Sequence, residues 1–446
     1  MRNHPSRLFA WMVLPGLLAL CGCDPFQIAP RRAFAYLESA QNPADIKMQT
    51  IGFTSDYAGG WPQFLYFDFA PALRYRDVSP FTVAFIHHSL SLINEDTVEA
   101  LGMTQHDAFR ARQMRLQALA YMERFASRPD DPGVGTYGFW PYSADPNAPV
   151  SELERTAFQW LQGPVFRGSR TPPNVGFYPR AMAIAPDADT TACILAARLN
   201  GSLMDGGTLP PDSSCLHVLT DWRDTGQVMR RLNPSWLQDQ SGLFLTWLDY
   251  RFPGDPFAEN DVDLLVNANV LFAMARFGRL DLPGVSDAVS TINSIVEQGL
   301  HRTAFHTVSE YYPDNVAFEY CVSRAYHEGP VPDLQAAVER MADELVAEAT
   351  LHPDGTTSWD RGAPALNTAF AVLTLMNAGR DTPVVEQGLA YLVRQQSLHH
   401  GSWSEGPFFK GQTTRGITVY WVSEAFTTAI ALEAFCRFRL HEAGIG

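Results

Sequence analysis

The segment of the sequence that most suggests chemistry is Asp187-Ala188-Asp189-Thr190-Thr191, in which one residue separates two carboxyl groups. A buried, protonated Asp189 could donate a proton if Asp187 or the Thr190 hydroxyl stabilised the carboxylate left behind. The same residues also suit the start of a helix, where acids and hydroxyls accept backbone N–H groups and favour the helix dipole. Both interpretations remain open from the sequence, and both place the segment at a helix N-terminus.

Other polar residues begin or interrupt apolar segments elsewhere in the chain. Asp263 and Glu424 stand at two such starts, so they are candidates either for helix caps or for binding a substrate. Asn267 lies inside an apolar run, as does Asn269, where an amide must bond to a neighbour or face a cavity. His88 is the last candidate, as a partner for Asp189 or as a satisfied buried histidine.

Six apolar segments have the composition of helices buried on both sides. They are Phe81–Ile93, Asp189–Leu199, Asp263–Phe277, Asn315–Tyr326, Ala365–Ala378 and Ser423–Phe438. More amphipathic segments alternate with them: Arg31–Gln41, Ala108–Ala126, a weak one at Cys215–Leu232, Val285–Leu300, Leu334–Ala349 and Pro383–Gln396. Such a sixfold alternation predicts an all-α fold, a single (α/α)6 toroid whose inner helices are covered by outer ones. Polar N-termini of the inner helices would then meet at one end of the ring.

A second repeat follows several outer segments. Its clearest copy has a small residue, an aromatic-aliphatic pair, Gln396 and then Gly401-Ser402-Trp403. A half copy ends at Gln41, with Trp61 after an insertion, and fainter ones end at Trp140 and Trp359. We expect Gln to cap the outer helix and Trp to pack over the next turn of the ring.

These features together resemble a known family. The Gln–Trp repeat resembles the QW motif of squalene and oxidosqualene cyclases, and Asp187 to Thr191 resembles the DxDD or DxDTT signature of class II terpene cyclases, with Thr190 where many members carry Asp. The resemblance implies a terpene-cyclase and prenyltransferase type of toroid. It also implies that Asp189 protonates an alkene or epoxide, supported by Asp187 and Thr190, in a cavity lined with aromatic rings. No cofactor is implied.

The chain departs from that family in its size and its expected location. Class II cyclases usually have two helical domains and work in the cytoplasm, whereas this chain has room for one ring and begins like an exported protein. The zinc set of protein prenyltransferases cannot be assembled, so no metal is expected. Of the four later cysteines, Cys193, Cys321 and Cys436 lie in apolar helical runs and are expected to be buried thiols, whereas Cys215 lies in the weak segment.

The N-terminus predicts export and a lipid anchor. Arg2 and Arg7 precede an apolar run that is short for a membrane span, and Leu20-Cys21-Gly22-Cys23 resembles a lipobox. Residues 1–23 are therefore expected to be a signal peptide and residues 24–446 one domain, anchored to the envelope through acylated Cys23. A plain signal peptide is the alternative. The net charge of −15 disfavours nucleic acid as a partner.

Three functions remain open from the sequence. The first is a class II cyclase-like enzyme, an isomerase that acts on an isoprenoid or similar apolar lipid in the cell envelope. The second is an (α/α)6 enzyme on envelope carbohydrate, with Asp189 and either Asp263 or Glu424 as acid and base. The third is a non-catalytic envelope lipoprotein that binds a ligand.

Overall fold

The structure is a computed structural model that describes residues 24–47, 55–127, 135–139, 186–204, 214–226, 229–230, 232–248, 259–380, 383–412 and 417–445. The predicted signal peptide, Cys21, Cys23 and Trp140 lie outside the described residues. No helix within those ranges is both long and apolar enough to cross a membrane.

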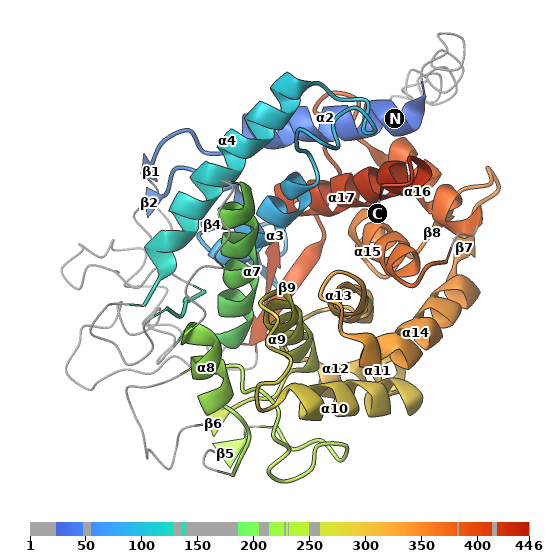
Figure 1. The fold of residues 1–446 in the computed structure, drawn as a ribbon. Helices are drawn as coiled ribbons and strands as arrows, with labels where there is room; N and C mark the ends of the chain where they lie inside the picture. Colours follow the sequence, from blue (N-terminus) through green and yellow to red (C-terminus); the bar gives the residue numbers. More distant parts are fainter. Residues whose placement is uncertain are drawn as a thin grey trace.

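Six helices form the inner ring, each close to the bounds expected from the sequence. They are α3 (Pro80–Ser91), α7 (Ala188–Met204), α9 (Leu264–Arg276), α13 (Asn315–His327), α15 (Pro364–Asn377) and α17 (Glu424–Glu442). Each packs on the next in chain order, and α17 closes the ring against α3 (Figure 1). The predicted toroid is therefore confirmed.

The inner helices are apolar nearly all round because both of their sides are covered. In α9 every residue from Leu264 to Ala275 is buried, and in α3 every residue from Pro80 to Leu90. Polar caps start most of these helices: Ser79 accepts from Phe81 N–H, and Ser423 accepts from Phe426 N–H. Such caps satisfy N–H groups that have no partner inside the helix.

Six further helices lie on the outside. They are α2 (Pro25–Ala40), α4 (Gln105–Met122), α8 (Ser214–Asp221), α10 (Val285–Glu297), α14 (Gln335–Glu348) and α16 (Pro383–Gln395). The third of them, α8, is short, in line with the weak signal at Cys215–Leu232. Within the described residues the remaining helical turns are short: α11 (Leu300–Thr303), α12 (Phe305–Val308), η1 (Glu123–Phe125) and η2 (Pro332–Leu334).

One four-stranded antiparallel sheet accompanies the mostly helical ring. It joins β3 (Gln63–Phe67) and β4 (Tyr75–Asp77), which precede the first inner helix, to β9 (Pro407–Gln412) and β10 (Thr418–Val422), which precede the last, in the order β4-β3-β10-β9. Short pairs link β1 (Ile46–Lys47) to β2 (Ser55–Asp56), β5 (Met229–Arg230) to β6 (Glu259–Asn260), and β7 (Thr350–Leu351) to β8 (Thr357–Ser358). Strand β5 lies inside the weak segment Cys215–Leu232, and the other strands lie in loops that the helical repeat left unassigned.

The Gln and Trp repeat has a shared geometry in two copies. The side-chain amide of Gln396 donates to the Ala29 and Gly401 carbonyls, and the Trp403 indole donates to Leu392 O at 2.7 Å. In the N-terminal copy Gln41 donates to Gly59 O and Met114 O, and the Trp61 indole donates to Leu37 O at 2.8 Å. These contacts tie the end of each outer helix to the next element of the ring. Trp359 makes the same indole contact, to Leu345 O.

Candidate active site

Asp189 lies in the first turn of α7 and points into the ring. The residue is only 4% exposed. One carboxylate oxygen accepts from the Asn269 amide on α9 at 2.6 Å, and the other accepts a short hydrogen bond from the Tyr312 hydroxyl just before α13. Three successive inner elements therefore meet at this carboxyl group, and both of its partners are uncharged.

A positive charge acts on this carboxyl group through the amide. Arg324 on α13 donates from Nη2 to the Asn269 Oδ1 at 2.6 Å, and the same amide donates to Asp189. The guanidinium is stacked on the rings of Phe85 and Phe272, with 4.5 and 4.3 Å to the ring centroids. Because Arg324 polarises the Asn269 amide, it strengthens the hydrogen bond that stabilises ionised Asp189.

Burial raises the pKa of Asp189, and these donors limit the rise. Desolvation raises the pKa of Asp189 to about 6, and Asp263 nearby adds to the rise. Hydrogen bonds from Tyr312 and Asn269, and the charge of Arg324, oppose the rise by favouring the carboxylate. A dry acid whose conjugate base has donors already in place is suited to giving a proton to a weak base.

Asp187 caps the same helix and retains its proton more strongly. Its Oδ1 accepts from Thr190 N–H at 2.6 Å, so the helix-cap interpretation holds for this residue. Burial, then the charge of Asp189, raise the pKa of Asp187 to about 8, and hydrogen bonds from Thr190 oppose the rise. The two carboxyl groups are thus electrically coupled, with Asp187 the one that remains protonated at neutral pH.

Aromatic rings gather beside the acid at this end of the ring. The ring of Tyr312 contacts Phe81 and Phe409, with centroids 6.2 and 5.6 Å apart. Phe409, on strand β9, in turn contacts Trp421 and Phe139. The four-stranded sheet therefore brings aromatic side chains over the N-terminal ends of the inner helices.

Below the acid, the described side chains leave a small cavity. It has a volume of about 10 Å³ among Phe85, Cys193, Phe272 and Arg324, which is room for one water molecule at most. The aromatic faces at this level are already occupied by the Arg324 guanidinium. A larger molecule would have to meet Asp189 from the side where Tyr312 and Phe409 lie.

Asp263 and Asn267, two of the predicted binding residues, hold the chain itself. Asp263 caps α9 and its carboxylate accepts from five donors: the backbone of Leu265, Val266, Glu310 and Tyr311 and the Ser309 hydroxyl. Asn267 exchanges two hydrogen bonds with the backbone of Phe244. Their polar atoms are committed to these structural contacts.

Glu424 and His88 are placed away from the acid. Glu424 accepts from the Ser402 hydroxyl in the loop before β9. His88 Nε2 lies 3.0 Å from Glu328 and 3.8 Å from Glu433, near the C-terminal ends of the inner helices. The structure thus gives His88 carboxylate partners other than Asp189.

Three of these groups have the spacing of metal ligands. His88, Glu328 and Glu433 place their ligand atoms within 4.8 Å of one another, and they form the one such group in the described part of the chain. Arg437 already pairs with both carboxylates, at 2.5 Å to Glu328 and 3.0 Å to Glu433. A guanidinium in that place supplies the positive charge that a metal ion would bring, so the cluster is a buried ion-pair network.

Two residues at the acid were not expected from the sequence. Tyr312 belongs to a pair of tyrosines just before an inner helix, a signal that was present but unspecific. Arg324 is a charge within an apolar helix, and such a residue marks a site only once its partner is known. Cys193, Cys321 and Cys436 are buried free thiols, as predicted.

Several solved structures that align with this chain are those of a type II terpene cyclase. The cyclase MstE from Scytonema, without ligand, aligns with a TM-score of 0.53 and 14% identity over 95% of this chain and 99% of its own. A variant of MstE in complex with geranylgeranyl dihydroxybenzoate gives 0.53 and 13%, over 93% and 97%. A protein from Actinoplanes gives 0.51 and 14%, over 92% and 99%. No sequence family and no curated protein matches the chain.

The chain has the fold of these cyclases. The alignments cover nearly the whole of each structure, so the likeness extends over a single ring and not over one half of a larger enzyme. At 13–14% identity they establish the fold alone.

Proposed function

We propose that the protein is a class II terpene cyclase-like enzyme that protonates an isoprenoid or similar apolar lipid. The observation that carries the proposal is Asp189: a buried carboxyl group on the inner wall of a cyclase-type ring, held by two neutral donors and without a direct ion pair to a described residue. The fold shared with type II terpene cyclases supports the same class of reaction.

In the proposed reaction the protonated form of Asp189 gives its proton to one carbon of an alkene. The π electrons form the new C–H bond, the other carbon becomes a cation, and a second alkene closes the ring by attacking it. The last cation loses a proton to water, which completes an isomerisation, and water returns a proton to the Asp189 carboxylate. Asn269 and Tyr312 are positioning residues that stabilise the carboxylate of Asp189, and Asp187 holds a proton beside it.

The aromatic cluster formed by Phe81, Tyr312, Phe409 and Trp421 suits the cationic intermediates. Ring faces attract a nearby cation by roughly 0.5–2 kcal/mol each when water is excluded. Two of these rings contact Tyr312, whose hydroxyl bonds the acid, so they lie near the place where the cation would form.

The proposed setting is the cell envelope, with Cys23 as the acylated N-terminus after removal of residues 1–22. The lipobox-like Leu20-Cys21-Gly22-Cys23 supports this part of the proposal. An envelope location would give an anchored enzyme direct access to apolar lipids.

The small interior cavity favours a second candidate, a binding or scaffold lipoprotein whose ring is not catalytic. The cavity beside Arg324 holds at most one water molecule, as expected for a ring whose interior is packed for stability. The carbohydrate alternative has less support, because Asp263 is committed to five backbone and hydroxyl donors and Glu424 to Ser402.

Asp189→Asn tests the first candidate directly. The amide cannot give up a proton, so formation of cyclised products from geranylgeranyl-type substrates should fall by about 10²–10⁴-fold. Asp314→Asn is the matched control, since Asp314 caps the inner helix α13 through Val316 N–H and an asparagine can cap equally well. Lipid extracts of cells that carry each variant give the readout. Equal isoprenoid profiles in wild type and Asp189→Asn would favour the scaffold candidate.

A further inference from the structure

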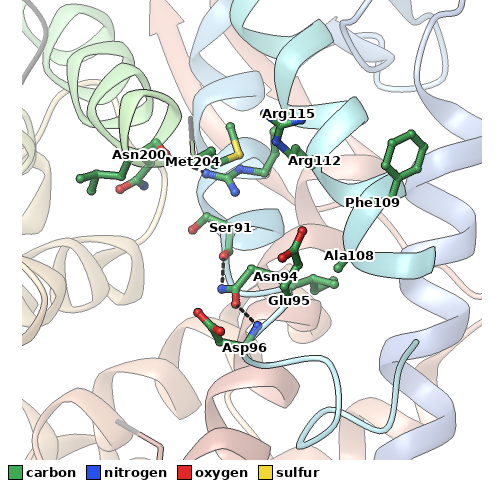
Figure 2. A pocket seen from close by; sticks show the side chains of 12 residues that line it. Ser91, Asn94, Glu95, Asp96, Ala108, Phe109, Arg112, Arg115, Asn200 and Met204 are labelled. Atoms are coloured by element: carbon green, nitrogen blue, oxygen red, sulfur yellow. Dashed lines mark hydrogen bonds between the residues drawn. The ribbon is translucent and has the colours of Figure 1, made fainter. Parts of the chain in front are cut away.

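A second pocket, independent of the proposed reaction, lies at the other end of the ring. Its volume is about 600 Å³, and it is bordered by the C-terminal parts of α3 and α7 and by α4 (Figure 2). Asn200 on its wall is 11 residues along α7 from Asp189, about 16 Å away by helical rise. The pocket is thus distinct from the candidate active site.

Arg115 is the unusual residue of this pocket. It is 4% exposed, and its Nη2 donates to the Asn200 carbonyl at 3.2 Å, but its Nε has no hydrogen-bond partner. No described carboxylate forms an ion pair with it. A buried guanidinium without a counter-charge is costly, because nothing replaces the water it has lost.

The neighbours of Arg115 increase the need for negative charge. Burial and the nearby charge of Arg112 lower the pKa of Arg115 to about 10. Burial and Arg115 in turn lower the pKa of His87, so this imidazole is neutral at physiological pH and adds no further positive charge. Arg112 and Arg115 both line the pocket, three residues apart on α4.

The opposite side of the pocket is acidic. Figure 2 shows Glu95 and Asp96 across from the two arginines. Both acids are exposed, and Asn94 orders their loop by donating to Ser91 O and accepting from Asp96 N–H. A simple anion would be attracted by one wall and repelled by the other, whereas a ligand with both charges would satisfy the two.

We propose that this pocket binds a zwitterionic phosphate ester of the phosphoethanolamine type. Its phosphate would accept hydrogen bonds from Arg115 and Arg112, which match the geometry of phosphate oxygens, and its ammonium group would face Glu95 and Asp96. Phe109 also lines the pocket, as does Leu203, and each is 56% exposed. They offer contacts to the apolar part of an ester, such as the acyl chains of a lipid.

Calorimetric titration of the full-length protein tests the site with two probes, glycerophosphoethanolamine and inorganic phosphate. Wild type should bind the ester more tightly than phosphate, and Arg115→Gln should weaken ester binding at least about tenfold. Arg110→Gln is the matched control, because Arg110 lies on the same helix but pairs with Glu38 and Asp107. That control should bind as wild type does. Thermal melting shows whether Arg115→Gln is folded, and Arg112→Gln replaces it in the comparison if it is not.

The double variant Glu95→Gln, Asp96→Asn separates the two charges of the ligand. It should weaken binding of the ester and strengthen binding of phosphate, because only the ester gains from the acids. The lipid dihexanoyl phosphatidylethanolamine then identifies the source: tighter binding than the glycerol ester indicates a lipid head group, and equal binding a water-soluble ester. Failure of wild type to bind the ester, or equal binding by Arg115→Gln and Arg110→Gln, would overturn the proposal.

Discussion

Both ends of the inner ring bury carboxyl groups, but they do so in different ways. At the N-terminal end Asp189 and Asp187 are held by an amide, a phenol and backbone N–H, and burial raises the pKa of both. At the C-terminal end Arg437 pairs with both Glu328 and Glu433, and its charge, with that of His88, holds the pKa of Glu328 far below its usual range. Neutral partners leave a proton available, whereas an arginine removes it. Only the N-terminal end can therefore supply an acid.

The largest expected effect is on stability, at the C-terminal end. Arg437→Met should lower the free energy of unfolding by about 3–5 kcal/mol, because it leaves Glu328 and Glu433 buried without their counter-charge. Urea denaturation followed by circular dichroism measures the loss. Arg380→Met is the control, since its pair with Asp343 is largely solvated and should contribute less than about 1 kcal/mol. Equal losses of stability in the two variants would show that the buried ion pairs of Arg437 contribute no more than a solvated pair.

The next effect is on catalysis, at the N-terminal end. Tyr312→Phe removes a donor that stabilises the Asp189 carboxylate, so product formation should fall by about 10²-fold. The variant should also raise the pKa of Asp189, and the loss of activity at high pH should then occur at a higher pH than in wild type. Rates measured across pH check both effects. A lower rate with an unchanged pH profile would mean that Tyr312 acts only in packing.

The third effect is a slope in stability with pH, observed as a change per pH unit. Asp187 has a folded pKa of about 8, above its unfolded value, so its protonated form is the one that folding favours. Its contribution to stability is complete below the unfolded pKa and is lost as pH rises through about 8, at about 1.4 kcal/mol per pH unit between the two values. Asp187→Asn should remove this slope and retain the helix cap. Chemical denaturation at a series of pH values measures the slope. If Asp187 were ionised with an ordinary pKa, wild type and Asp187→Asn would have the same slope.

The ring was predictable from sequence, and part of the site with it. Helices such as Leu264–Arg276, which are apolar on every side, have few alternatives to a buried ring, and Asp189 and Asn269 stood out as polar residues within such runs. Tyr312 and Arg324 were not predictable, because their roles depend on which faces of α7, α9 and α13 meet. The spacing of residues along the chain does not determine how each helix is rotated about its own axis.

The sheet and the ion-pair network were missed for the same reason. Strand β3 pairs with β10 across some 350 residues, so no local pattern reports it. His88, Glu328 and Glu433 come from three helices and meet only when the ring closes. From sequence alone Asp263 and Glu424 could have been helix caps or catalytic groups. Their hydrogen bonds make Asp263 the cap of α9 and pair Glu424 with Ser402.

The central claim is that the N-terminal end of the ring retains a protonated carboxyl group at neutral pH. Infrared difference spectra of wild type against Asp187→Asn and Asp189→Asn, recorded from about pH 4 to about pH 9, test it most directly. We expect a carboxylic-acid carbonyl band at pH 7 that titrates with midpoints near 6 and 8 and changes in both variants. A band already lost by about pH 5, or one unaffected by either substitution, would contradict it.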